Sequence, residues 1–330
     1  MPVFNVHYSD DFDQKLYVEE VIRKWNQGDQ EFHIYTSGTT NKPKKITLSR
    51  ELLVWSAITT QNKLDTTSHK IMCCLPVDKT GGFMQLIRAL VWDCEIHFFK
   101  PSNQPFIKIN NHSFTTISLT PTQFKSSFED SFEKLNKFQH ILIGGAAFNN
   151  PSIFIERLKH PLIWYTYGMT ETASHVAMQN LSRNEASLKV LPGVNIRQNK
   201  TLEIHIPEVN LYFKTNDIVK FENGGFIVLG RSDDVINSGG IKIHPQQLET
   251  TIEEVFEKMN LKKRFYISKE KHDKYGEVPV LTIEGNPDFN QGEFTQILTQ
   301  QLPDYHAPKN IYFTPEILST DTGKVIREAY

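Results

Sequence analysis

The chain has 330 residues, and its 36 lysines and arginines nearly balance its 38 aspartates and glutamates, which gives a formal net charge of -2. This balance argues against a nucleic-acid or membrane-surface partner, because such partners are bound by basic patches. The length favours a large α/β domain followed by a smaller one. The sequence has no apolar leader and no apolar run long enough to span a bilayer, so we expect a cytoplasmic protein without membrane insertion.

The three cysteines, Cys73, Cys74 and Cys94, lie in apolar surroundings. Their odd number and the absence of CxxC or Cys/His spacing argue against a disulfide framework or a zinc site. Free cysteine is among the most buried residue types. We therefore expect all three to be buried, reduced and structural.

Hydrophobic periodicity predicts the elements of the first half of the chain. Apolar residues at helical spacing over 14–26 precede a glycine and a short apolar run, which predicts a helix and then a buried strand. More strand-like runs follow, with helical stretches between several of them, and this alternation predicts an α/β fold with parallel strands. Ligands of such sheets bind beyond the carboxyl ends of the strands. The predicted strands are residues 32–35, 71–75, 96–99, 116–119, 141–143 and 163–167.

The pattern changes after about residue 185 to short strands with tight turns. Two of these strands flank an Asn-Gly-Gly turn at residues 223–225, which predicts a hairpin. The last hundred residues have the pattern of a separate, small α+β unit. The elements predicted in this part are strands at 202–206, 211–214, 218–221, 226–229, 265–268 and 278–284, and a helix near 246–259.

The most informative segment is residues 35–44, Tyr-Thr-Ser-Gly-Thr-Thr-Asn-Lys-Pro-Lys. Backbone N–H groups, hydroxyls and ammonium groups arranged in this way bind polyphosphates. The spacing of a Walker loop is absent, and taken alone the segment could equally be an ordinary polar turn. It resembles the signature loop of the adenylate-forming superfamily, which contains acyl- and aryl-CoA ligases, luciferases and the adenylation domains of peptide synthetases.

Further segments resemble motifs of the same superfamily and follow its order along the chain. Residues 167–172, Tyr-Gly-Met-Thr-Glu-Thr, resemble its aromatic-Gly-x-Thr-Glu motif, whose ring lies against adenine and whose glutamate holds Mg²⁺. Residues 213–217 are similar to its Thr-Gly-Asp element, in which the aspartate binds the ribose, and Arg231 matches the supporting arginine. Residues 144–147 resemble the turn that lines the adenine pocket, and residues 320–324 resemble the motif of the catalytic lysine.

The resemblance implies a large N-terminal α/β domain with stacked sheets, shortened at its N-terminus and spanning residues 1–231. It also implies a small mobile C-terminal α+β lid, residues 232–330. The implied activity is an ATP-dependent acid:CoA ligase that uses Mg²⁺: the carboxylate attacks the α-phosphorus, pyrophosphate leaves, and the CoA thiolate then attacks the acyl-adenylate. Positioning and electrostatic stabilisation supply most of the rate of such a displacement.

The resemblance also assigns a role to individual residues. The catalytic group would be Lys324, Glu171 and Thr170, with Glu171 as the metal ligand. The nucleotide would be bound by Thr36, Ser37, Gly38, Thr39, Thr40, Lys44, Gly144, Gly145, Ala146, Tyr167, Gly168, Asp217 and Arg231.

The small domain of this superfamily rotates between the two half-reactions. Asp233 stands at the position of the hinge residue, just after Arg231, and a few loop residues absorb the change of backbone angles in such closures. Gly239 and Gly240 match a glycine-containing stretch that approaches the pantetheine tunnel, although a plain β-turn explains a glycine pair as well.

Two features point to the acid. Residues 118–123, Ser-Leu-Thr-Pro-Thr-Gln, and the compact length are similar to the o-succinylbenzoate-CoA ligases of menaquinone biosynthesis. Succinylbenzoate carries a second carboxylate, and Arg88 on the predicted helix 82–91 is our candidate ligand for it, with Lys79 and Gly82 nearby. An arginine on a helix is as readily an exposed residue that extends its head group to water.

Some features depart from the superfamily pattern. Asn41 and Asn216 replace glycines, and Lys79 replaces a frequent histidine. Only about 34 residues precede the phosphate segment, fewer than in full-length relatives, so we expect the surface that the missing region would cover to be covered by a second copy, in a homodimer. The alternatives are another aryl- or acyl-CoA ligase, an adenylation enzyme that loads a carrier protein, and a non-catalytic nucleotide sensor.

Overall fold

The computed structural model describes residues 4–36, 44–65, 69–109, 113–149, 151–318 and 325–327. Its contacts divide the chain into two compact units. The first unit comprises Met1–Ile196, Ile204–Phe213 and Glu222–Phe226, and the second comprises Arg197–Glu203, Lys214–Phe221 and Ile227–Tyr330. The functional boundary after residue 231 stays a prediction.

The first unit is built on an eight-stranded sheet with the strand order β1-β5-β4-β6-β7-β8-β9-β10. The strands from β1 to β8 in this order are parallel to their neighbours, and β9 and β10 complete the sheet with antiparallel pairing. The bounds are β1 Asn5–Tyr8, β4 Lys70–Cys73, β5 Glu95–Phe98, β6 Thr116–Leu119, β7 His140–Ile143, β8 Leu162–Met169, β9 Ser174–Asn180 and β10 Lys189–Val190.

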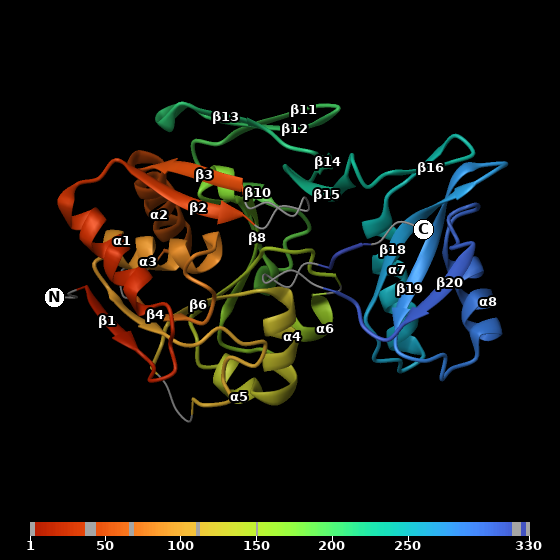
Figure 1. Cartoon of the computed structure of the whole chain (residues 1–330), viewed down its shortest axis with the longest axis horizontal. Coiled ribbons are helices and arrows are strands. Elements are labelled where there is room, and N and C mark those ends of the chain that lie inside the picture. The colour runs from red at the N-terminus through yellow and green to blue at the C-terminus, as the bar shows by residue number, and fades with distance from the viewer. Residues whose placement is uncertain are drawn as a thin grey trace. The chain divides into compact units, whose positions relative to one another are not determined.

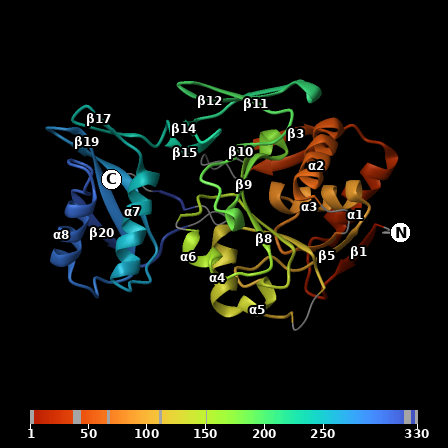
Figure 2. The same cartoon turned by 180° about the vertical axis from the view of Figure 1, so that it is seen from behind.

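Helices cover both faces of this sheet, α2 and α3 on one side and α4 and α5 on the other (Figures 1 and 2). Their bounds, with those of α1 and α6, are α1 Lys15–Gln27, α2 Arg50–Leu64, α3 Thr80–Trp92, α4 Pro121–Asp130, α5 Phe132–Leu135 and α6 Ser152–Ile155. A capping box starts α4, because the Thr120 hydroxyl accepts from the backbone N–H of Gln123 and the Gln123 side chain accepts from the backbone N–H of Thr120. Phe124 of α4 is fully buried against Ile117 and Ile141 of the sheet.

Smaller sheets complete this part of the chain. β2 (Glu31–Thr36) pairs antiparallel with β3 (Lys44–Ser49), so the strand expected at 32–35 forms a hairpin outside the large sheet. β11 (Asn195–Asn199), β12 (Thr201–Ile206) and β13 (Leu211–Lys214) form a three-stranded sheet. The short 3-10 helices are η1 Thr170–Thr172, η2 Leu181–Arg183 and η3 Pro207–Val209.

The hairpin expected around the Asn-Gly-Gly turn is confirmed. β14 (Asp217–Glu222) and β15 (Gly225–Arg231) form a two-stranded sheet joined through Asn223 and Gly224. Both residues have positive φ, 52° and 68°. A type I′ turn needs this conformation at both central positions, which is why Asn-Gly is favoured there.

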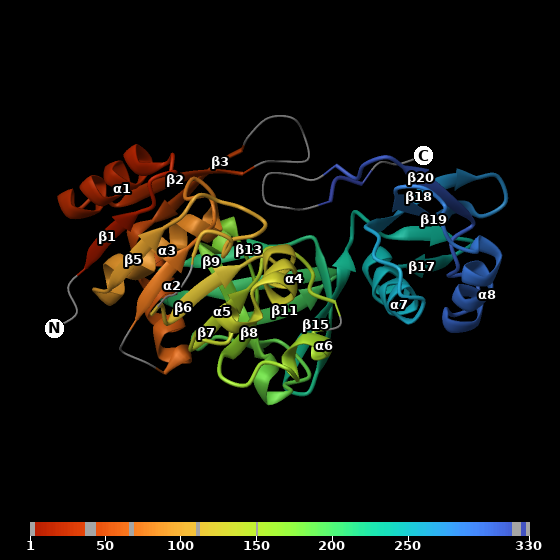
Figure 3. The ribbon, with the colours of Figure 1, turned by 90° about the horizontal axis from the view of Figure 1, so that it is seen from below.

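The second unit contains a five-stranded sheet, and its strands and two helices are the blue and teal elements of Figure 3. The sheet has the order β17-β16-β19-β18, with β20 paired in parallel to β19. Ile252 and Phe256 of α7 pack with Leu281 of β19 and Phe294 of α8 in one buried core. The bounds are β16 Ile236–Ser238, β17 Ile241–Ile243, α7 Pro245–Lys258, β18 Phe265–His272, β19 Gly276–Glu284, α8 Gln291–Gln301 and β20 Asn310–Thr314.

The predicted α/β class with a separate α+β unit is confirmed. Cys73, Cys74 and Cys94 are free and buried, as expected. Burial raises the pKa of the Cys73 thiol to about 12, which keeps it protonated and unreactive at neutral pH. None of the helices in the described part of the chain has the length and apolar character needed to cross a membrane.

Candidate active site

The carboxyl ends of three parallel strands carry predicted motifs at one edge of the large sheet. Gly144 follows β7, Thr170 follows β8, and the loop to Gly82 follows β4. These strands lie within the run β4-β6-β7-β8. From β4 the chain continues to β5 on one side and then to β6 on the other side, so the direction in which successive strands are added to the sheet reverses at β4. Ligands of open α/β sheets bind at this edge, near such a reversal.

The end of β8 is shaped by a glycine. A Cβ on Gly168 would lie 2.0 Å from the backbone oxygen of Ser174, so only glycine fits where β8 turns into β9. The register with β9 shifts between Tyr167 and Gly168, and the Tyr167 ring packs edge-on against Phe226 with 5.4 Å between ring centroids. The chain then enters η1, which leaves Glu171 partly exposed. The Tyr167 ring is therefore held by its packing, and Glu171 follows it four residues later, just beyond the end of the strand.

The turn after β7 is held against β8. A Cβ on Gly144 would lie 2.3 Å from Oγ1 of Thr166, whose hydroxyl donates to the backbone oxygen of Ile143 at 3.1 Å. Gly145 has φ +87°, and an added Cβ there would meet no atom within 4 Å. The backbone at Gly145 therefore borders open space. A flat base can approach such a backbone closely, so the turn, which continues into Ala146, fits the adenine role.

The loop from β4 to α3 is fixed to the end of β8. The hydroxyls of Thr80 and Thr170 are 2.6 Å apart. A Cβ on Gly82 would lie 2.4 Å from the backbone oxygen of Pro76, so close packing explains this glycine without any substrate contact. The ammonium group of Lys79 forms an ion pair with its neighbour Asp78 at 3.3 Å. Lys79 and Gly82 as substrate contacts stay predictions.

Arg88 is buried, with 4% of its surface exposed, and the alternative of an exposed helical arginine is wrong. Its Nη2 donates to the hydroxyl of Ser174 at 2.9 Å and lies 3.4 Å from Nδ1 of His175. Among the described residues, its Nε has no hydrogen-bond partner and no carboxylate forms an ion pair with the guanidinium. Burial lowers the pKa of Arg88 from 12.5 to about 10. Within the described part of the chain, the guanidinium is therefore a buried cation without a counter-charge.

The neighbours of Arg88 were not predicted from the sequence. Nε2 of His175 lies 3.0 Å from the Thr60 hydroxyl on α2. Burial, and then the charge of Arg88, holds the pKa of His175 well below its usual range, so this imidazole is neutral at physiological pH and adds no second positive charge. The only signal in the sequence was that Ser174 and His175 lie three and four residues after the glutamate of the aromatic-Gly-x-Thr-Glu motif.

The second unit brings together Asp217, Arg231 and Asp233. Nη1 of Arg231 lies 3.8 Å from a carboxylate oxygen of Asp217, and its Nε and Nη2 donate to Asp233 at 2.9 and 2.7 Å. Asn216 also donates to Asp233, at 3.2 Å. Burial raises the pKa of Asp233, but the hydrogen bonds from Arg231 outweigh this effect and hold that pKa below its usual value. Arg231 therefore forms ion pairs with both aspartates. Its supporting role, ribose binding by Asp217 and the hinge at Asp233 stay predictions.

Gly239 and Gly240 form the two-residue turn of the β16–β17 hairpin. Both have positive φ, 58° and 90°, and Ser238 pairs with Ile241 across the turn. The plain β-turn interpretation is therefore correct as a description of the backbone. A role in CoA binding stays a prediction.

Several predicted residues lie outside the described part of the chain. These are Ser37, Gly38, Thr39, Thr40 and Lys324, and the side chain of Thr36 is likewise outside it. Lys44 is the first residue of β3, exposed and paired in register with Thr36.

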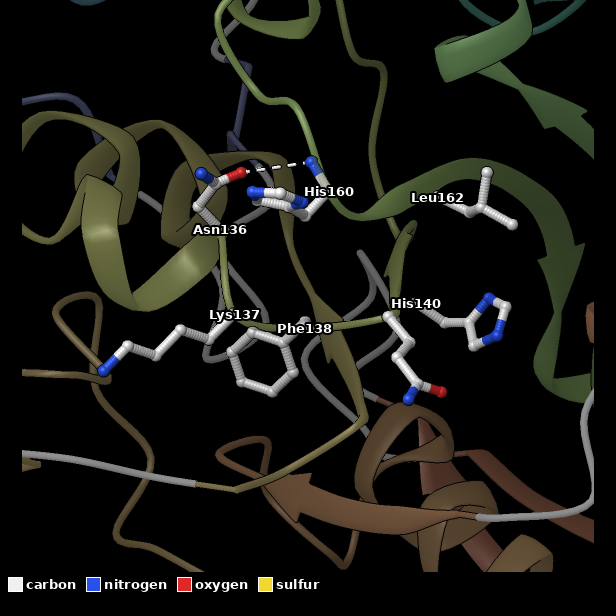
Figure 4. A pocket seen from close by; sticks show the side chains of 7 residues that line it. Asn136, Lys137, Phe138, His140, His160 and Leu162 are labelled. Atoms are coloured by element: carbon white, nitrogen blue, oxygen red, sulfur yellow. Dashed lines mark hydrogen bonds between the residues drawn. The ribbon is translucent and has the colours of Figure 1, made fainter.

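A hollow at the opposite edge of the sheet carries none of the predicted motifs (Figure 4). It lies at the amino ends of β7 and β8, where Asn136 Oδ1 accepts from the backbone N–H of His160 at 3.2 Å. Its lining is Asn136, Lys137, Phe138, Gln139, His140, His160 and Leu162. Since ligands of parallel sheets bind at the carboxyl ends, we do not assign the active site to this hollow.

The AMP-binding enzyme family matches residues 6–205 of the chain. The chain belongs to the AMP-binding enzyme family. It is 25% identical to the 2-succinylbenzoate–CoA ligase of Listeria monocytogenes, over 93% of this chain and 71% of the relative. It is also 25% identical to the enzyme of the same name from Staphylococcus epidermidis, over 98% of this chain and 74% of the relative.

Solved structures agree with this membership. An acyl-CoA synthetase (AMP-forming)/AMP-acid ligase II-like protein from Dyadobacter fermentans is 32% identical, with a TM-score of 0.61 over 93% of this chain and 91% of that one. The o-succinylbenzoate CoA synthetase of Bacillus subtilis, in complex with its acyl-adenylate intermediate, is 22% identical, with a TM-score of 0.79 over 98% and 77%. This second likeness shows the shared fold.

The predicted superfamily and the class of AMP-forming acyl-CoA ligase are confirmed. ATP, Mg²⁺ and CoA as its ligands stay predictions. The residues of this AMP-binding enzyme fit such ligands. Glu171 offers a hard carboxylate oxygen of the kind that Mg²⁺ prefers, at the carboxyl edge of the sheet. Gly145 leaves open space at its backbone for a base.

Proposed function

We propose that the protein is an o-succinylbenzoate-CoA ligase of menaquinone biosynthesis. The observation that carries the proposal is Arg88, a buried cation without a carboxylate partner among the described residues. The names of the relatives at 25% identity support the same acid.

The chemistry of this acid fits Arg88. A buried charge is costly unless it is paired, and o-succinylbenzoate brings a second carboxylate besides the one that reacts. That carboxylate would accept from the Nε that has no partner and would supply the missing negative charge. A fatty acid has no second carboxylate to pair with Arg88, and its apolar chain would lie against a buried cation.

The reaction would proceed in two half-reactions on this framework. Thr36, Ser37, Gly38, Thr39, Thr40 and Lys44 would hold the leaving β- and γ-phosphates, and Tyr167, Gly168, Gly144, Gly145 and Ala146 would hold adenine. Glu171, with Thr170 beside it, would hold Mg²⁺, which offsets phosphate charge during the displacement.

Residues nearer the C-terminus would supply the remaining groups. Lys324 would bridge the reacting carboxylate and the α-phosphate, a role that suits a compact charge on a flexible stem. Asp217, supported by Arg231, would bind the ribose. We propose that residues 232–330 then rotate about Asp233, so that Gly239 and Gly240 approach the pantetheine arm of CoA for thioester formation.

Product analysis tests this function. Purified protein is mixed with ATP, Mg²⁺, CoA and one acid at a time, from a panel of o-succinylbenzoate, benzoate and a medium-chain fatty acid, and products are detected by mass. Succinylbenzoyl-CoA and AMP, formed with that acid alone, are the expected result. A thioester with another acid would replace the proposed substrate, adenylate without thioester would favour a carrier-loading enzyme, and neither product with any acid would favour a nucleotide sensor.

We also propose that the enzyme is cytoplasmic and acts as a homodimer. β1 lies at the end of the large sheet among the described strands, and an edge strand can pair with another chain. One chain has a mass of 38.1 kDa. Light scattering after size-exclusion chromatography should give twice this mass. A monomer at micromolar concentration would contradict the dimer, and cell fractionation tests the location.

A further inference from the structure

Two histidines and a glutamate meet on one face of the edge strand β1 and its neighbour β5. In the parallel register of these strands, His7 pairs with His97 and Asn5 pairs with Glu95. Side chains alternate along a strand, so Glu95 and His97 share one face, while Ile96 on the opposite face is fully buried. The sheet itself therefore places the three polar side chains together.

The atoms of this group converge as metal ligands do. Oε1 of Glu95 lies 3.3 Å from Nε2 of His7 and 2.5 Å from Nε2 of His97. One ligand atom from each residue lies within 4.8 Å of the other two, and no other such group of three or more occurs among the residues that the structure describes. In a tetrahedral Zn²⁺ site with bonds of about 2.1 Å, ligand atoms are about 3.4 Å apart. To reach this geometry, the two imidazole rings must rotate so that both Nε2 lone pairs point at one ion.

Neighbouring groups hold the two imidazoles in place. The rings of His7 and His97 are stacked, with 4.2 Å between centroids and 19° between planes. Phe114 packs edge-on against His97 at 4.9 Å. The ammonium group of Lys70 also lies 3.1 Å from Oε1 of Glu95. A metal would compete with Lys70 for that oxygen, although a carboxylate can share its two oxygens between two cations.

We propose that His7, Glu95 and His97 form a binding site for a divalent transition metal of the Zn²⁺ class. Two imidazole nitrogens and one carboxylate oxygen form a donor set that suits Zn²⁺, whereas Mg²⁺ and Ca²⁺ prefer oxygen ligands alone. The bound ion ties the edge strand β1 to β5. The site is separate from the Mg²⁺ site assigned to Glu171, so it stands whether or not the proposed substrate is correct.

Calorimetric titration of the full chain, with any purification tag removed, tests the site with Zn²⁺ and with Mg²⁺ as the probes. We expect one Zn²⁺ per chain at this site and no heat of Mg²⁺ binding to it. His7→Phe keeps an aromatic ring in the stack but removes the ligand atom, and it should weaken Zn²⁺ binding by at least about tenfold, as should Glu95→Gln.

The matched control is His205→Phe. His205 is also an exposed strand histidine beside an aromatic ring, with 6.4 Å between its centroid and that of Tyr212, and its replacement should leave Zn²⁺ affinity unchanged. Co²⁺ gives a second readout, because its visible absorption reports nitrogen coordination and should disappear in His7→Phe. Absence of saturable Zn²⁺ binding, or equal binding by the wild type and His7→Phe, would overturn the proposal.

Discussion

Replacing Arg88 with methionine tests whether this arginine serves substrate binding or the stability of the fold. Burial lowers the pKa of Arg88 from 12.5 to about 10, which corresponds to about 3 kcal/mol of unfavourable free energy for the buried cation. The variant removes this cost and loses the hydrogen bond to Ser174, worth roughly 1.5–3 kcal/mol for a charged donor. The two effects nearly cancel. We therefore expect the free energy of unfolding to stay the same or to rise by up to about 1.5 kcal/mol.

The effect on the substrate should be large and selective. Loss of the partner of a desolvated carboxylate costs roughly 2–5 kcal/mol, so kcat/KM for o-succinylbenzoate should fall by about 30-fold or more. Any activity on benzoate, which lacks the second carboxylate, should change little. Pyrophosphate release measures the activities, and urea denaturation measures the stability.

A matched control is Arg157→Met. Arg157 is an exposed arginine of the same unit whose guanidinium lies over the ring of Phe128 at 4.9 Å, and its replacement should change neither the ratio of the two activities nor the preference for the acid. The reasoning is refuted if Arg88→Met lowers the free energy of unfolding by several kcal/mol while the ratio of the two activities stays constant.

Three further predictions concern catalysis, pH and packing. Lys324→Ala should lower adenylate formation by orders of magnitude but preserve thioester formation from a supplied acyl-adenylate, and equal loss of both half-reactions would argue against domain rotation. His175 has a depressed pKa in the folded protein, so the unfolded state binds the extra proton, and stability should fall as pH drops below 6.5 by up to about 1.4 kcal/mol per pH unit. Urea denaturation of His175→Gln should show a smaller loss of stability below pH 6.5 than the wild type. The same pH dependence in both proteins would contradict this reasoning. Gly168→Ala places a methyl group 2.0 Å from a backbone oxygen and should cost about 1–3 kcal/mol, whereas Gly292→Ala, where the nearest atom is at 3.4 Å, should be tolerated.

Local patterns predicted those features whose causes are local. The helix expected at 14–26 is α1 (Lys15–Gln27), and the strand expected at 116–119 is β6. Apolar spacing reports the side of an element that is buried, and an Asn-Gly pair reports a turn with positive φ, so neither needs knowledge of distant residues. The same logic placed the motifs at strand ends, and the parallel sheet then brought Gly144, Thr170 and Gly82 to one edge.

Other features depend on contacts between distant segments. The strand expected at 32–35 is present and buries Phe32 and Ile34, but it pairs with β3 in a separate hairpin, and Tyr35 is 52% exposed. An apolar run of four residues does not specify its partner strand. The hydrogen bond from Arg88 to Ser174 likewise joins helix α3 to strand β9, which sequence spacing does not describe.

The sequence by itself determined the family and the order of its motifs, because the chemistry of phosphate, base and metal binding requires particular residue types at fixed spacing. The tertiary structure alone decided that Arg88 is buried without a carboxylate partner among the residues described, and that His7, Glu95 and His97 converge on one sheet face. Burial of a charge and convergence of ligands are set by the packing of elements that lie far apart along the chain, and no local pattern encodes that packing.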